Sequence, residues 1–191
     1  MKQQKDAAHT GHFHAVQFYQ DDTSLTSIVA GFLAEGFAKG DPVVVIATPK
    51  HRAAIEADLR KRSLDVDELK RLGDLVLLDA RETLATFMVD GMPHAATFRH
   101  LVGETMKQLC SGRGNCTIHV YGEMVNVLWK DGLEAAAIRL ETLWNELANA
   151  HEFKLLCGYS MGNFYKAAAV KEITGHHSHL VADTGTTATI N

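Results

Sequence analysis

Polar residues that could bind a ligand follow three of the most apolar, β-rich stretches of the chain. Tyrosine and methionine can line an adaptable apolar pocket, while carboxylates and a hydroxyl can fix the polar end of a ligand. If the three stretches are neighbouring parallel strands, their carboxyl ends would form one crevice. The expected ligand-binding residues are Tyr19, Asp21 and Asp22 after the first stretch, Thr48 after the second, and Gly122, Glu123 and Met124 after the third.

Helix capping is a simpler role for two of these carboxylates. Aspartate is a preferred N-cap residue, so Asp22 could cap the helix that follows the first stretch. Glu123 stands in the same position before a later helix. Ligand binding and capping therefore both remain open for this crevice.

The histidines form a second candidate group, since the chain holds 11 of them and several cluster near its two ends. His12 and His14 alternate and would share one face of a strand, and His177 and His179 could present two more imidazoles. Neutral imidazole binds zinc and other transition metals, but neither pair has zinc-finger or H-E-x-x-H spacing. We therefore expect surface and capping side chains, with no metal and no cofactor. A metal-responsive regulator stays the weakest alternative.

A G-x-S-x-G sequence at 158–162 is the single hint of an enzyme. It follows a predicted strand and opens a helix, which is the context of the nucleophile elbow in α/β-hydrolases. Downstream, only Glu172, Asp183 and the closing histidines remain to act as acid and base, and no His-Gly-Gly-Gly oxyanion stretch occurs. A small serine hydrolase that uses Ser160 is thus the alternative, and we expect no enzymatic activity.

Strands separated by helices must position these residues. The stretch 43–47 reads Val-Val-Val-Ile-Ala without polar alternation, which indicates a strand covered on both faces. Helix and buried strand then alternate along the chain. We expect a three-layer, doubly wound α/β domain with a mainly parallel, five-stranded sheet. The strands are expected at 12–19, 43–48, 75–80, 117–121 and 153–159, and the last helix at 163–173.

The length, the charge and the apolar runs of the chain limit its domain number, its partners and its location. The 191 residues are enough for one domain, expected at 12–181, with flexible tails at 1–11 and 182–191. With 19 basic and 23 acidic residues and no basic run, direct nucleic-acid binding is not expected. The longest apolar runs are strand-length and no signal peptide is recognisable, so we expect no membrane contact and a cytoplasmic location.

The three cysteines show no C-x-x-C spacing. Cys110, Cys116 and Cys157 are therefore expected to be reduced thiols. Cys157 stands in an apolar stretch and is expected to be a small core residue rather than a nucleophile.

Five short motifs in order resemble the MEDS family, the sensory domain of methanogen and methylotroph regulators, including the repressor of dichloromethane metabolism. The motifs lie at 14–22, 40–48, 121–125, 143–147 and 177–179, and the resemblance covers residues 12–181. It implies a sensor of small organic molecules such as hydrocarbon derivatives. Because no output domain is recognisable, it also implies a partner regulator or kinase, with a homo-oligomer left open.

The order of elements also resembles a RecA/KaiC-type ATPase core, which implies the strand order 3-2-4-1-5 and makes strands one and four neighbours. The strand at 16–19 then stands in the phosphate-loop place and the strand at 118–121 in the Walker B place. The loop 20–24 contains neither glycine nor lysine, and no G-x-x-x-x-G-K-[ST] motif occurs. Since a phosphate loop needs those residues, we expect the scaffold of an ATPase without its phosphate chemistry.

Overall fold

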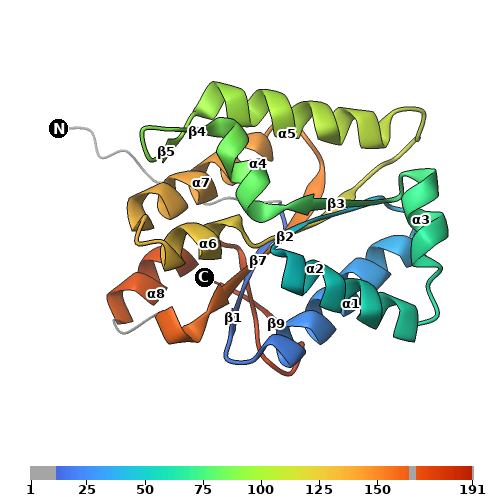
Figure 1. The fold of residues 1–191 in the computed structure, drawn as a ribbon, viewed down its shortest axis with the longest axis horizontal. Helices are drawn as coiled ribbons and strands as arrows, with labels where there is room; N and C mark the ends of the chain where they lie inside the picture. Colours follow the sequence, from blue (N-terminus) through green and yellow to red (C-terminus); the bar gives the residue numbers. More distant parts are fainter. Residues whose placement is uncertain (1–11, 164–166, 191) are drawn as a thin grey trace.

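A seven-stranded sheet runs through the molecule, and helices cover both of its faces (Figure 1). The computed structural model describes residues 12–163 and 167–190. The expected tail at 1–11 and part of the expected last helix, 164–166, lie outside the described residues. The strands of the sheet are β1 (His14–Tyr19), β2 (Val43–Ala47), β3 (Leu75–Asp79), β6 (Ile118–Gly122), β7 (Phe153–Ser160), β8 (His179–Val181) and β9 (Thr187–Thr189).

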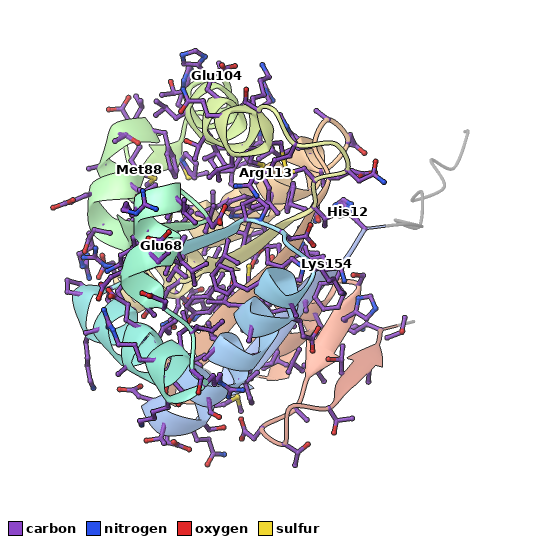
Figure 2. All side chains as sticks on the ribbon, turned by 90° about the vertical axis from the view of Figure 1, so that its right-hand side faces the viewer. His12, Glu68, Met88, Glu104, Arg113 and Lys154 are labelled. Atoms are coloured by element: carbon purple, nitrogen blue, oxygen red, sulfur yellow. A yellow bond between two sulfur atoms is a disulfide. The ribbon has the colours of Figure 1, made fainter. Side chains whose placement is uncertain are left out.

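The helices fall into two groups, one for each face of the sheet. Side chains fill the layers between sheet and helices (Figure 2). One hydrophobic core lies under α1 (Asp22–Ala38), α2 (Pro49–Lys61) and α3 (Val66–Leu72). The other lies under α4 (Ala80–Phe87), α5 (Ala95–Cys110), α6 (Met124–Lys130), α7 (Glu134–Leu147) and α8 (Ala167–Thr174). A 3-10 turn, η1 (Met161–Asn163), follows β7, and β4 (Met88–Val89) and β5 (Met92–Pro93) form a small separate hairpin.

The strand order is β3-β2-β6-β7-β1-β8-β9, and all neighbouring pairs are parallel except β8 and β9. The predicted α/β fold with a mainly parallel sheet is confirmed, but the sheet has seven strands instead of the predicted five, because β8 and β9 extend it beyond β1. The predicted order 3-2-4-1-5 is wrong, because the fifth predicted strand, β7, lies between the fourth, β6, and the first, β1. Six of the eight residues of β7 are buried. A strand covered on both faces belongs in the interior of a sheet, with a paired neighbour on each side.

The C-terminal segment also differs from the expected flexible tail at 182–191. It forms a hairpin in which β9 pairs with β8, and Gly185 adopts a positive φ of 80° in the turn. The hairpin is attached to the sheet because β8 pairs with β1. The Ser178 hydroxyl reinforces this attachment by donating to the backbone oxygen of His12 and accepting from the backbone N–H of His14.

The expectation of three reduced thiols is corrected. Cys110 and Cys116 form a disulfide that joins the end of α5 to the segment before β6. The short loop between them reverses direction at Gly112, which has a positive φ, and so brings the two sulfur atoms together. Cys157 is fully buried in β7, as predicted. None of the helices in the described ranges combines the length and apolar character that a membrane span requires.

Candidate functional site

The Glu123 carboxylate is the centre of a polar network at the carboxyl ends of the strands. Its Oε2 atom accepts hydrogen bonds from the backbone N–H (2.9 Å) and the hydroxyl (3.1 Å) of Thr48. Its Oε1 atom lies 2.9 Å from Nδ1 of His51, and Nε2 of His51 lies 3.2 Å from the Asp22 carboxylate. We call Tyr19, Asp22, Thr48, His51 and Glu123 the edge network. It assembles although β7 separates β1 from β6.

The two aspartates after β1 have different roles. Asp21, not Asp22, caps α1 by accepting a hydrogen bond of 2.8 Å from the backbone N–H of Ser24. Asp22 instead contacts His51 and Lys50. Hydrogen bonding to Lys50 is the largest cause that lowers the pKa of the Asp22 carboxyl. Glu123 occupies the N-cap position of α6, but its side chain does not cap that helix.

An amide continues the network toward β7. The Asn126 side chain donates a hydrogen bond of 3.1 Å to the Tyr19 hydroxyl and accepts one of 3.1 Å from the backbone N–H of Ser160. Burial, followed by the nearby charges of Glu123 and Asp22, raises the pKa of Tyr19, which is therefore neutral. Asn126 thus ties the ends of β1 and β7 to α6.

Two of the expected ligand residues, Met124 and Gly122, lie in closely packed positions. Met124 is 1% exposed and belongs to the hydrophobic core on the α6 side of the sheet. Gly122 is the last residue of β6, and a Cβ atom there would come within 3.7 Å of Leu155. Neither residue joins the polar contacts of Glu123.

His51 is the residue that sequence reasoning missed at this edge. It lies on the buried stripe of α2 with Ile55 and Leu59, four and eight residues later. A histidine on an otherwise apolar stripe is the signal that could have identified it. Burial lowers the pKa of His51, but its contacts with Glu123 and Asp22 more than offset this effect, so the pKa is raised overall.

An apolar cavity of about 290 Å³ opens beside this edge, between the sheet and helices α4 and α5. Its floor is buried and apolar, whereas polar side chains of α4 and α5 stand at its mouth. The lining residues are Val44, Ile46, Leu78, Asp79 and Val120 of the sheet, Glu82, Thr83 and Thr86 of α4, Leu101, Val102, Thr105 and Met106 of α5, and Trp144 of α7.

Ser160, the candidate nucleophile, ends β7 and is followed by η1. Its backbone N–H bonds to Asn126, but within residues 12–163 and 167–190 no histidine or carboxylate hydrogen-bonds its hydroxyl. A serine nucleophile needs a base within hydrogen-bond reach. The described residues therefore bring no catalytic partner to Ser160.

The terminal histidines separate into two environments. His14 and His177 are buried with ring centroids 4.1 Å apart, and both approach the Glu141 carboxylate. His12 lies at the periphery (Figure 2), and His179 stacks on Phe13. The expectation of surface and capping side chains is therefore wrong for His14 and His177, which are buried and face each other because β1 and the segment before β8 lie side by side. One ligand atom each from His14, Glu141, Cys157 and His177 lies within 4.8 Å of the others, and we call these four residues the buried histidine cluster.

Glu141 is fully buried on the inner face of α7, next to Leu140 and Trp144. Burial raises the pKa of this carboxyl, but His177, His14 and the Tyr159 hydroxyl offset it and lower the value to about 2. Burial and the facing His14 ring lower the pKa of His177 to about 3. Glu141 is therefore ionised and His177 neutral. As with His51, the missed signal is an ionisable residue on an apolar helical stripe.

Comparison with known proteins agrees with this architecture. A solved structure of a KaiC-like protein from the hyperthermophilic archaeon Pyrococcus horikoshii OT3 matches with a TM-score of 0.59 and 11% sequence identity. The match covers 89% of this chain and 71% of the archaeal chain. At this low identity it shows the fold alone, and it confirms the predicted RecA/KaiC-like core.

The comparison of sequences is more specific. A search of curated proteins gives no match. The model of the MEDS family, described as the methanogen/methylotroph, DcmR sensory domain, matches residues 13–178. This match spans most of the sheet, both helical layers, the edge network and the buried histidine cluster. The chain therefore belongs to the MEDS family of sensory domains.

Proposed function

We propose that this sensory domain binds a small, partly apolar organic molecule in the cavity between α4, α5 and the sheet, and signals to a partner regulator or kinase. Membership of a sensory family supports the general role. The observation that carries the location is the apolar cavity of about 290 Å³. Ligand pockets for small molecules have volumes of a few hundred Å³, mostly apolar walls and a few polar groups.

The lining of the cavity suits such a ligand. Val44, Ile46 and Val120 form a dry floor, because each is at most 4% exposed. Thr83 and Thr105 offer hydroxyl groups nearer the mouth. A hydrocarbon derivative with one polar substituent could bury its apolar part on the floor and hydrogen-bond a threonine.

Contacts of α4 could carry the signal. Asp79, which lines the cavity, caps α4 and also pairs with Arg52 of α2 at 3.0 Å. Arg81 of α4 pairs with Asp131 after α6 at 2.7 Å. A ligand that favours one position of α4 would therefore act on α2 and α6, provided that its affinity differs between the two positions.

The edge network is the alternative location of the ligand, as first expected for Tyr19, Asp22 and Glu123. Its carboxylate and phenol already have partners, because Thr48 donates twice to Glu123 and Asn126 donates to Tyr19. A ligand there would have to displace these contacts, and burying a polar group without a partner costs free energy. This argument favours the cavity.

A binding screen decides between the two locations. Chlorinated methanes, short alcohols and methylamines would be tested by thermal shift and by NMR titration of the whole chain. Thr83→Phe fills the cavity and should abolish the shift, whereas Ala85→Phe on the exposed side of the same helix should retain it. If Glu123→Gln lost binding while Thr83→Phe retained it, we would place the ligand at the edge network instead. No response to any compound would contradict sensing of this chemical class.

A further inference from the structure

The position of the proton on His14 follows from its partner Asn145. The Asn145 Nδ2 group donates a hydrogen bond of 2.9 Å to the backbone oxygen of His176, which fixes the orientation of the amide. Its Oδ1 atom therefore faces Nδ1 of His14, at 2.9 Å. Since an amide oxygen only accepts, Nδ1 of His14 carries a hydrogen, and in the neutral ring Nε2 has a lone pair.

His177 is oriented in the same way by a backbone group. Its Nδ1 atom lies 2.8 Å from the carbonyl oxygen of Ile173, so this nitrogen is the donor. The Nε2 atom is buried and has no hydrogen-bond partner among residues 12–163 and 167–190. The His177 imidazole thus turns an Nε2 lone pair toward the interior of the cluster, and Nε2 of His14 faces the same place.

The Glu141 carboxylate supplies two further acceptor atoms inside the cluster. Oε2 of Glu141 lies 3.2 Å from Nε2 of His14, and Oε1 lies 3.5 Å from Nε2 of His177. The Tyr159 hydroxyl donates to Oε1 at 2.7 Å. If Nε2 of His14 carried a proton, it could donate to Oε2 of Glu141. The His177 lone pair would still face the carboxylate. A cation between the ligand atoms would satisfy all of them.

The distances fit a tetrahedral ion. Bonds of about 2.0–2.1 Å to nitrogen or oxygen and about 2.3 Å to sulfur place neighbouring ligand atoms roughly 3.3–3.6 Å apart. The separations of Nε2 of His14 from Glu141 and from the Cys157 sulfur are 3.2 and 3.5 Å. The Cys157 sulfur lies 3.7 Å from Glu141. Nε2 of His177 lies within 4.8 Å of these atoms, so its ring must move inward to close on an ion, whereas the other three side chains need little movement.

We propose that His14, Glu141, Cys157 and His177 form a structural binding site for one divalent transition-metal ion, with Zn²⁺ as the best fit. Two imidazoles, one carboxylate and one thiolate make a closed four-ligand set of the type that Zn²⁺ accepts. On binding, Cys157 loses its thiol proton to solvent, and two negative ligands then balance the charge of the ion. Asn145 and the Ile173 carbonyl hold the imidazoles as outer-sphere partners commonly do.

Such an ion would join four distant segments of the chain. Its ligands come from β1, α7, β7 and the segment between α8 and β8. The site would thereby fasten the C-terminal hairpin to the core. Spacing could not reveal it, because the ligands stand at positions 14, 141, 157 and 177 rather than in a local motif.

Metal analysis of the purified chain tests the proposal. After loading with Zn²⁺ and dialysis, elemental analysis should give about one zinc per chain. His177→Gln and Cys157→Ser should lose most of it, while His12→Gln and His179→Gln, which change histidines outside the cluster, should retain it. Asn145→Ala should weaken zinc affinity by about 10- to 100-fold, as loss of an outer-sphere partner does.

Cobalt spectroscopy keeps the test decisive if a ligand variant fails to fold. Co²⁺ bound to the unmodified chain should give the visible absorption of a tetrahedral ion and a sulfur-to-cobalt charge-transfer band, and Zn²⁺ should remove both. Absence of these bands, or zinc retained at full stoichiometry in folded Cys157→Ser and His177→Gln chains, would overturn the proposal. Failure of the ligand screen would leave this result unaffected.

Discussion

The edge network and the buried histidine cluster each place a glutamate between polar partners, but those partners differ. Glu123 receives an N–H and an O–H from Thr48 and contacts His51, and the network reaches solvent through Asp22, which is 41% exposed. Glu141 accepts hydrogen bonds from the Tyr159 hydroxyl and the Cys157 thiol, and it also faces two imidazole nitrogens in a fully buried place.

The two regions differ in their supply of hydrogen-bond donors rather than in their residue types. The edge network supplies donors to both of its carboxylates, two from Thr48 to Glu123 and one from Lys50 to Asp22. The buried histidine cluster has more acceptors than donors at its centre. Buried acceptors without donors are costly, so an excess of this kind points to an additional cation, whereas a satisfied network does not.

Removing each glutamate should give the largest effect and test this contrast. Glu141→Ala leaves the buried Tyr159 hydroxyl and Cys157 thiol without their acceptor and opens a cavity under α7, and it should cost about 3–5 kcal/mol in free energy of unfolding. Glu123→Ala leaves the Thr48 donors to be resolvated near the surface and should cost about 1–3 kcal/mol. Urea denaturation measures both. Equal costs would remove the distinction between the two regions, and Asp22→Asn, at the exposed end, is the matched control for a small loss.

The pH dependence of stability should sharpen the contrast at a smaller scale. The pKa of His51 is raised in the folded protein, so its stabilisation is complete below the unfolded value of about 6.5 and is lost as pH rises through the folded pKa. The difference in unfolding free energy between the unmodified chain and His51→Gln should therefore become smaller as the pH rises above about 6.5. Denaturation curves at several pH values check this. A difference that grows with pH would contradict the assigned contacts with Asp22 and Glu123.

Ser160 should give the smallest effect, because among the described residues its link toward the edge network is the hydrogen bond from its backbone N–H to Asn126. Ser160→Ala should change stability by less than about 1 kcal/mol and leave ligand binding intact. We also expect no labelling of the chain by a fluorophosphonate probe. Labelling that disappears in Ser160→Ala would identify a serine nucleophile and contradict the proposal that this protein is a sensor without hydrolase activity.

The sequence predicts the parallel sheet well because buried parallel strands leave an unbroken apolar run, as in 43–47. It does not predict where β7 inserts, since apolar runs show burial on both faces but not the identity of the neighbours. It also misses the pairing of Cys110 with Cys116 and the strand β9. Those features depend on the local reversal at Gly112 and on the partner strand β8.

Prediction of the site residues was uneven for a related reason. Tyr19 ends β1, and Asp22, Thr48 and Glu123 come after strands; parallel strands bring their carboxyl ends to one edge. His51 and Glu141 lie inside helices, where one polar residue on an apolar stripe has no unique partner in the sequence. Only the packing of α2 and α7 against the sheet identifies those partners.

The hairpin of β8 and β9 has a consequence for association between molecules. In the described chain it ends the sheet on the β1 side with a strand of three exposed residues, Thr187–Thr189. Long, flat, apolar edge strands invite pairing with other chains and lead to aggregation. Here three of the six residues of β1 are paired with β8, and the terminal edge is short and carries two threonines. The hairpin thus limits edge-to-edge association on this side of the sheet.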